Sequence, residues 1–372
     1  MILRSCRMLL ISLICWLSCN VNVNAQLLKD SATFEKIRKG VDHIYNLEFK
    51  EANKIYDEIK SGYPTQTVPF LYKAMIVYWQ NYPLVPGTDA SRLFEENLVK
   101  CYTLAEKYME EGGTDAEDLL SGLGALGLLL LYYSDNGYTR NVISLAPETY
   151  HFVMKSFEFT SSYSDFYFIT GLYNYYREAY PELHPIYKPV IIFFPHGDKK
   201  LGLKQLKIAS DSSIFLQAEA NAFLSGIYQG FERDSRKALI YSRKLVEKYP
   251  KNTQFNTAYI RDLLLAKKYN EAEKLMDSLP YPYDNKYYQA QIDILRGIIY
   301  EKKYKDLVKA RKYYWSGIQK AESYKIFGNE YAAYGYFGLS RVYQSGDDKK
   351  MKKQYRKQAK ELADYEYINF DD

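Results

Sequence analysis

The sequence predicts an all-α fold, a solenoid of stacked helical hairpins. Apolar residues recur with helical rather than strand periodicity along the whole chain. One pattern of small and terminating residues occurs twice with a spacing of twelve, as Gly40, Ala52 and Pro64 and again as Gly226, Ala238 and Pro250. Ala272 follows Ala238 by 34 residues, a period typical of repeats built from two packed helices.

Each member of the pattern has a physical role in such a hairpin. In the second copy, we expect one helix over Phe215–Gln229 and another over Ser235–Lys248. Gly226 lacks a Cβ and would let a neighbouring helix approach closely. Ala238 would occupy the tightest point of the pair, where a larger residue costs roughly 1–3 kcal/mol through overpacking. Pro250 has no N–H and would end the second helix.

These positions resemble the tetratricopeptide family. Around Ala52, the family's aromatic and apolar positions are filled by Phe49, Tyr56 and Ile59. A third unit keeps the family's pattern at Tyr269, Ala272 and Met276, although Ile260 replaces its glycine. Two further units diverge, one with Gly297, Ala310 and Tyr314 and one with Gly338, Met351 and Tyr355. The resemblance implies a right-handed superhelix with a concave groove.

The expected organisation follows from where the pattern is kept. Residues 26–65 form an N-terminal tetratricopeptide-like unit, and residues 213–364 form the C-terminal units. Residues 66–212 form a region of divergent helical hairpins, with an irregular proline-rich joint near 180–198. Residues 365–372 are a tail that we expect to fray. Between Gly171 and Leu206 the chain resembles the inclusion-body-clearance type of tetratricopeptide protein, from which no residue role is carried over.

The middle region divides into helices by its apolar periodicity and its breakers. Thr114 with Glu117 forms a capping box before an uncharged run, Leu119–Tyr133, which is too short for a membrane span. Asp198 is a predicted N-cap. The other expected helices are Val68–Tyr82, Ala90–Glu111, Ala146–Phe159, Ser164–Tyr180 and Lys199–Ala209.

Residues 1–25 have the features of a secretory signal peptide. Arg4 and Arg7 precede the apolar run Met8–Leu17, and Ala25 ends a small-residue cleavage site. The alternative is a lipid anchor at Cys19. Either route predicts export across the inner membrane to a periplasmic or envelope-associated location. Cleavage would leave one of the four cysteines, Cys101, which we expect to be a small buried hydrophobe.

The sequence predicts no enzyme. A G-x-G-x-x-G match at Gly122–Gly127 lies inside a predicted helix without a preceding strand, so it indicates close helix packing. The four histidines form no zinc motif, and no nucleophilic serine motif occurs. We therefore expect no catalytic residue, cofactor or metal. Removal of Arg4 and Arg7 with the signal peptide would lower the formal net charge from +5 to +3, which is near neutral, so nothing points to nucleic acid as a partner.

Two compositional features leave alternatives open. The forty tyrosines either fill helix seams or provide stacking platforms for sugars. The last predicted helix, Asp347–Asp364, has a face of Lys349, Lys353, Arg356 and Lys360. That face is either the polar surface of a capping helix or a basic patch for anionic lipid or sugar.

The leading functional hypothesis is an exported, non-catalytic scaffold that binds a protein or peptide. In the family, the groove is lined by the first helix of each unit, with aromatic and apolar anchors. The alternative is a glycan-binding component of an envelope uptake system. The groove positions carried over from the family are Ala220, Phe223, Ile227, Phe231, Gln254, Thr257, Arg261, Leu264, Gln291 and Ile294.

Overall fold

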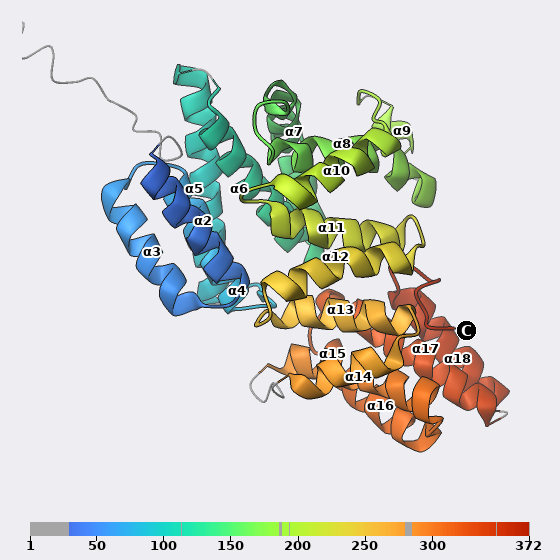
Figure 1. The fold of residues 1–372 in the computed structure, drawn as a ribbon. Coiled ribbons are helices and arrows are strands. Elements are labelled where there is room, and N and C mark those ends of the chain that lie inside the picture. Colours follow the sequence, from blue (N-terminus) through green and yellow to red (C-terminus); the bar gives the residue numbers. More distant parts are fainter. Residues whose placement is uncertain are drawn as a thin grey trace, which may run out of the picture.

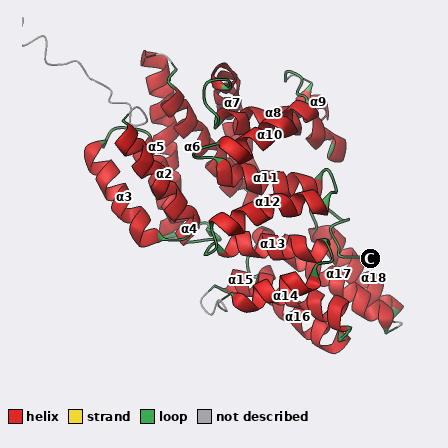
Figure 2. Cartoon of the chain, in the orientation of Figure 1, coloured by secondary structure: helices red, strands yellow, loops and turns green. Residues whose placement is uncertain are grey.

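The computed structural model describes residues 30–112, 114–185, 188–192, 194–279, 285–346 and 348–371. Every regular element in these ranges is a helix, and consecutive helices pack on one another (Figure 2). The prediction of an all-α helical-repeat solenoid is confirmed. The predicted signal peptide and Cys19 lie outside the described residues.

The helices are arranged through the molecule in chain order, from the N-terminal pair to the C-terminal pair (Figure 1). In chain order they are α2 Ser31–Tyr45, α3 Phe49–Gly62, α4 Val68–Gln80, α5 Asp89–Gly112, α6 Ala116–Asp135, α7 Thr139–Ser156, α8 Phe166–Leu183, α9 Lys188–Ile191, α10 Lys199–Ser212, α11 Gln217–Gly230, α12 Ser235–Lys248, α13 Thr253–Leu265, α14 Tyr269–Ser278, α15 Lys286–Ile299, α16 Leu307–Glu322, α17 Asn329–Ser345 and α18 Lys349–Leu362.

The small residues of the repeated pattern lie between packed helices. Ala52, Ala238 and Ala272 are fully buried, each at the same position of a second helix. Pro64 and Pro250 follow the ends of α3 and α12. The pattern therefore predicts both the tight contacts and the helix ends of these units.

The two glycines of the pattern differ in their surroundings. A Cβ on Gly40 would collide with the hydroxyl and ring of Tyr72, so this glycine permits a close approach between α2 and α4. A Cβ on Gly226 would meet no atom within 4 Å. The expected close approach at Gly226 is wrong, and on α11 it occurs one turn later, where the ring of Tyr365 packs on Gly230.

In the divergent fourth unit the glycine and the alanine, Gly297 and Ala310, stand thirteen residues apart instead of twelve, and the helices still keep their register. The chain between α15 and α16 forms a π-helix over Tyr300–Tyr304, followed by Lys305 in the left-handed conformation. A π-turn takes up one residue more than an α-turn. Gly297 on α15 and Gly338 on α17 therefore both pack against Tyr314, which is fully buried on α16.

The N-terminal hairpin docks against helices that lie some two hundred residues later in the sequence. Asn252 Nδ2 donates to the carbonyl oxygen of Tyr45 at 2.8 Å, and the Tyr249 hydroxyl donates to Asp42 at 2.8 Å. The Tyr45 ring lies 5.5 Å from that of Tyr249 and 6.2 Å from that of Phe255. In a simple solenoid each repeat contacts only its neighbours, so this chain departs from a strictly linear stack.

Helix α7 begins earlier than the sequence predicts. It starts at Thr139, not Ala146, and passes through Pro147. A proline inside a helix removes one backbone hydrogen bond. Val142 and Leu145, which precede the proline, pack against the cluster beneath α6. These two half-buried side chains anchor the first half of α7 to the core, although the residues around them are exposed.

Two helix starts within the middle region, those of α6 and α10, differ in how well they were predicted. Asp198 caps α10 as expected, since its side chain accepts from the backbone N–H of Lys200 at 2.8 Å. At α6 the capping side chain is Asp115, not Thr114, and it accepts from Glu117 N–H at 2.8 Å. Aspartate is at least as good a cap as threonine.

The proline-rich joint is tied to α8 by side chains. Helix α8 continues past Pro181, where the sequence predicts its end. The Arg177 guanidinium donates to the carbonyl oxygen of Phe194 at 3.0 Å, and Glu178 accepts from Gly197 N–H at 2.9 Å. These bonds hold the loop before α10 against the helix.

The C-terminal tail packs on the fold, so the expectation that it frays is wrong. Ile368 and Phe370 are buried, and Arg341 of α17 donates to the carbonyl oxygen of Asn369. The Tyr365 ring lies 5.8 Å from that of Phe231. Burial of these apolar side chains orders the segment, an effect that a position near the chain end does not reveal.

The two pattern glycines give opposite expectations for the same substitution. Gly40→Ala should lower the free energy of unfolding by about 1–3 kcal/mol, because the new methyl group collides with Tyr72. Gly226→Ala should raise it by about 0.5–1 kcal/mol, because alanine favours the helix and meets no neighbour. Urea unfolding of both variants measures the two changes, and a destabilised Gly226→Ala would contradict this packing.

Candidate binding site

An apolar cavity of about 380 Å³ lies where the N-terminal hairpin meets the middle helices. Its walls come from α2, α4, α6, α7, α8 and α11 together with the residues just before α11. This volume is in the lower part of the range of roughly 300–1,000 Å³ for ligand sites. Among the lining residues are Ile37, Val41, Val68, Leu71, Met75, Leu120, Leu123, Leu128, Leu130, Leu131, Val153, Phe168, Ile169, Leu172, Phe215, Leu216 and Phe223.

Helix α6 supplies most of one wall. Gly124 and Gly127 both line the cavity, and a Cβ on Gly127 would meet no atom within 4 Å. Leu131 on α6 is 39% exposed and Phe223 on α11 is 36% exposed, so the cavity opens towards solvent beside large apolar side chains. The uncharged run of the sequence therefore both packs inside the fold and faces this hollow.

By length and composition, α6 is the one helix of the described residues that could cross a membrane. More than half of its apolar window is buried within this fold. Leu119, Leu126 and Leu129 on α6 pack into the core. These contacts are those of a core helix.

Two polar atoms of the cavity wall are buried without a hydrogen-bond partner. They are the Tyr72 hydroxyl and Glu219 Oε2. Burial raises the pKa of Glu219 to about 8, although a hydrogen bond from its own backbone N–H and the charge of Lys248 act against this shift. The Glu219 carboxyl is therefore mostly neutral at pH 7 and can donate a hydrogen bond. Burial also raises the pKa of Tyr72.

Three of the predicted groove residues lie inside the protein. Ile227, Thr257 and Gln291 are at most 2% exposed. Ala220, Leu264 and Ile294, which the family also places in the groove, are equally buried. These side chains pack against the chain's own helices and present no surface to a partner.

Arg261 is part of an internal network. Its guanidinium lies 3.1 Å from Asp262 and 3.4 Å from Glu330 of α17. Asp262 is fully buried and accepts hydrogen bonds from Ser225 at 2.8 Å and Gln229 at 2.9 Å. Arg261 thus balances a buried carboxylate, a role that its family position does not indicate.

The other three predicted residues divide between the core and the cavity. The Phe231 ring packs 5.2 Å from the Tyr176 ring, and Gln254 Oε1 accepts from Gln291 Nε2 at 3.0 Å. Phe223 lines the cavity and lies 5.4 Å from the ring of Phe168. The cavity therefore includes one of the predicted partner-binding residues, Phe223, and none of Ile227, Phe231, Gln254, Thr257, Arg261 and Gln291.

Sequence reasoning missed most of the lining. The cavity's main contributors lie on α4 and α6, outside the recognisable repeats. One signal could have found them. Gly124 and Gly127 fall inside the uncharged run Leu119–Tyr133, a predicted helix in which glycine costs stability and needs a reason.

A second hollow of about 270 Å³ is polar and lies at the other end of α6. Asp135, Glu330 and Asp364 line it together with Tyr82 and Tyr287. Burial raises the pKa of Asp135 to about 7, and the negative charges of Asp364 and Glu330 add to the shift. Within the described ranges no group of three side chains is arranged to hold a metal ion.

Cys101 and the first glycine of the G-x-G-x-x-G match both lie in the packed core. Cys101 is fully buried, its Sγ lies 3.5 Å from the carbonyl oxygen of Ser121, and burial raises the pKa of the thiol. Gly122, the first glycine of the G-x-G-x-x-G match, lies on α6 and packs against Phe152 of α7. The match thus lies inside a helix and forms no loop before a helix start.

Comparisons with known proteins give no family. A scan against protein-family models finds no match, and a search of curated proteins finds no significant similarity.

The orphaned Glu219 carboxyl predicts a pH-dependent stability. The folded protein holds this proton up to about pH 8, whereas the unfolded chain loses it near pH 4.3. Stability should therefore fall as pH rises between these values, by roughly 2 kcal/mol after allowance for partial exposure. Glu219→Gln should remove that part of the slope in urea unfolding at several pH values.

The matched control is Glu247→Gln, which changes an exposed carboxyl on α12. The pKa of Asp135 is also raised, so this carboxyl makes the same contribution to the pH dependence of the free energy of unfolding in both variants. An identical slope in the Glu219→Gln variant and the unmodified protein would contradict the burial of this carboxyl.

Proposed function

We propose that the chain is an exported, non-catalytic scaffold of the tetratricopeptide type, which binds an apolar segment of a protein partner in the cavity bounded by α2, α4, α6, α7, α8 and α11. One observation carries this proposal. The cavity wall is almost entirely aliphatic and aromatic and opens beside Leu131 and Phe223. An apolar opening of this kind on a helical scaffold suits an amphipathic helix or an extended apolar segment.

The assignment to the tetratricopeptide type rests on packing and period together. Ala52, Ala238 and Ala272 occupy equivalent buried positions, and the last two stand 34 residues apart. A shared buried position at this period supports the family, in which ligand binding is the usual task. Export rests on residues 1–25, and cleavage after Ala25 is proposed over lipidation at Cys19.

Binding would draw on two kinds of contact. Each large apolar side chain that enters the cavity gains about 1.5–3 kcal/mol from burial. The neutral Glu219 carboxyl and the Tyr72 hydroxyl lack protein partners and can donate to a carbonyl oxygen of the bound segment. Such bonds would relieve the cost of two buried unsatisfied groups, which is roughly 1–3 kcal/mol each.

The tyrosines favour a peptide over a glycan. Sugars need many hydrogen-bonding groups around an exposed aromatic ring, whereas this lining has few polar atoms. Many of the tyrosine side chains are buried inside the fold. The fully buried or nearly fully buried examples include Tyr72, Tyr132, Tyr175, Tyr288 and Tyr314.

Filling the cavity at one open position tests the proposal. Gly127→Leu puts a side chain into the hollow, and it should also stabilise α6 because leucine favours helix by nearly 1 kcal/mol over glycine. Peptides would be selected on the unmodified protein from a displayed library and measured by fluorescence polarisation. Gly127→Leu should weaken their binding at least tenfold, with no loss of thermal stability.

Gly226→Leu is the matched control, because Gly226 also lies open in mid-helix but outside the cavity. It should keep the affinity of the unmodified protein. Selected peptides that bind Gly127→Leu equally well would contradict the site. A chain that selects no peptide but binds a glycan panel would support the uptake alternative instead.

A further inference from the structure

The positive charge of this protein is concentrated on one helix. Six lysines and Arg356 stand against Glu361 alone in the fourteen residues of α18, which gives the helix a net charge of +6. The whole chain carries +5, so all its other residues together sum to −1. The small net charge therefore conceals a strongly basic segment.

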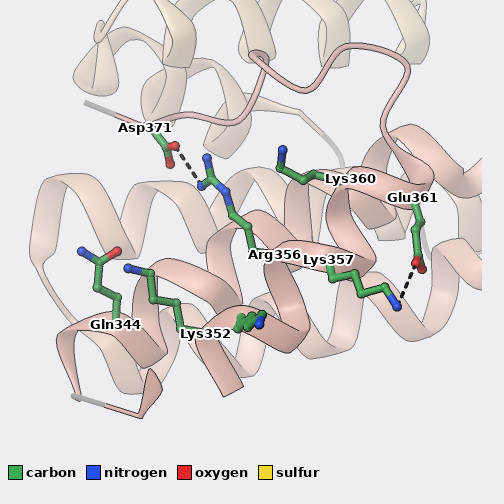
Figure 3. A pocket seen from close by; sticks show the side chains of 8 residues that line it. Gln344, Lys352, Arg356, Lys357, Lys360, Glu361 and Asp371 are labelled. Atoms are coloured by element: carbon green, nitrogen blue, oxygen red, sulfur yellow. Dashed lines mark hydrogen bonds and ion pairs between the residues drawn. The ribbon is translucent and has the colours of Figure 1, made fainter. Parts of the chain in front are cut away.

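Five of the six lysines of α18 are exposed, whereas Lys352 is half-buried and the Arg356 guanidinium lies over the Phe337 ring of α17. Helix α18 packs on α17 through Tyr355 and Ala359, which are both buried. Its charged side chains border a shallow hollow of about 690 Å³ (Figure 3). The side chain of Lys357 is 79% exposed and that of Lys360 48% exposed. In Figure 1 α18 lies at an edge of the molecule, close to the C-terminus.

Nearby carboxylates balance only part of this charge. Arg356 lies 2.9 Å from Asp371, Lys357 lies 3.6 Å from Glu361, and Lys360 pairs with Glu366. The other four lysines have no carboxylate partner among the residues that the structure describes. They are Lys349, Lys350, Lys352 and Lys353.

The arrangement is unfavourable for the isolated helix. Lys349 and Lys353, Lys353 and Lys357, and Arg356 and Lys360 are like-charged neighbours four residues apart, and such pairs destabilise a helix. Solubility alone does not require this pattern. Helix α3 has an exposed face with three lysines and three acidic residues, and so has no net charge.

We propose that α18 is a docking surface for the anionic phospholipid headgroups of a membrane. The basic residues of this helix, from Lys349 to Lys360, extend about 17 Å along its axis. Basic residues on an amphipathic helix are attracted to the negative potential of anionic lipid. The docking surface does not use the apolar cavity, so it stands independently of the proposed function.

The side chains of α18 fit lipid phosphates better than a nucleic acid. Proteins that bind single strands interleave basic residues with exposed aromatic rings on which bases stack. The one aromatic residue of α18 is Tyr355, and its ring is buried against the fold. Six of the seven basic residues are lysines, which act as point charges without reading base edges.

Vesicle co-sedimentation of the full chain tests this surface. The vesicles are phosphatidylcholine alone or phosphatidylcholine mixed with phosphatidylglycerol. The protein should bind the anionic vesicles, and high salt should release it. Lys353→Gln with Lys357→Gln should weaken this partition about 25-fold, since each lysine contributes about fivefold. Its melting temperature should not fall, because the change removes like-charge repulsion.

The matched control is Lys50→Gln with Lys54→Gln on α3, an exposed pair with the same spacing in a helix without net charge. It should partition like the unmodified protein. Residues 1–25 are the same in all three proteins, so any binding by that segment cancels in the comparison. Three results would overturn the proposal. They are equal binding of the protein to both kinds of vesicle, binding of the Lys353→Gln, Lys357→Gln variant to anionic vesicles as tight as that of the unmodified protein, and tighter binding to duplex DNA than to anionic vesicles.

Discussion

The arrangement of this protein depends on the docking of its N-terminal hairpin against α12 and α13. Asn252 donates to the Tyr45 carbonyl oxygen and Tyr249 donates to Asp42, across 207 residues of sequence in each case. Around these bonds, rings of Tyr45 and Phe255 pack with Trp79 of α4. The contact brings α2 opposite α11, and those two helices are walls of the apolar cavity. Without it, Glu219 and Tyr72 would lie in an open cleft.

The apolar cavity and the basic side chains of α18 belong to different parts of the molecule and share no residue. The cavity near α6 is apolar and contains two unsatisfied polar groups, a combination that lowers stability and suits a ligand. The basic side chains lie on α18, at the C-terminal end of the helix order. A scaffold with these surfaces could hold a protein segment near a membrane. Each surface has its own test, because neither depends on the residues of the other.

Local sequence rules predicted the repeat units and failed where distant segments meet. The spacing of Ala238 and Pro250 gave both limits of α12, because a tight contact and a helix end are set within one hairpin. Ile227, Thr257 and Gln291 were misplaced because the resemblance to the tetratricopeptide family implies an empty concave face, whereas here these side chains are buried inside the protein. No local pattern reveals that Tyr45 meets Asn252, and the cavity follows from that contact.

A cross-link across the N-terminal contact tests the central claim most directly. Lys251 N–H donates to the Asn46 side chain at 3.2 Å, so cysteines at these two positions should reach disulfide geometry. Asn46→Cys with Lys251→Cys should oxidise rapidly to one intramolecular disulfide, identified by mass spectrometry of the digest. Asn46→Cys with Lys204→Cys is the control. If the first pair forms no disulfide faster than the control, the hairpin does not dock there and the cavity loses its α2 wall.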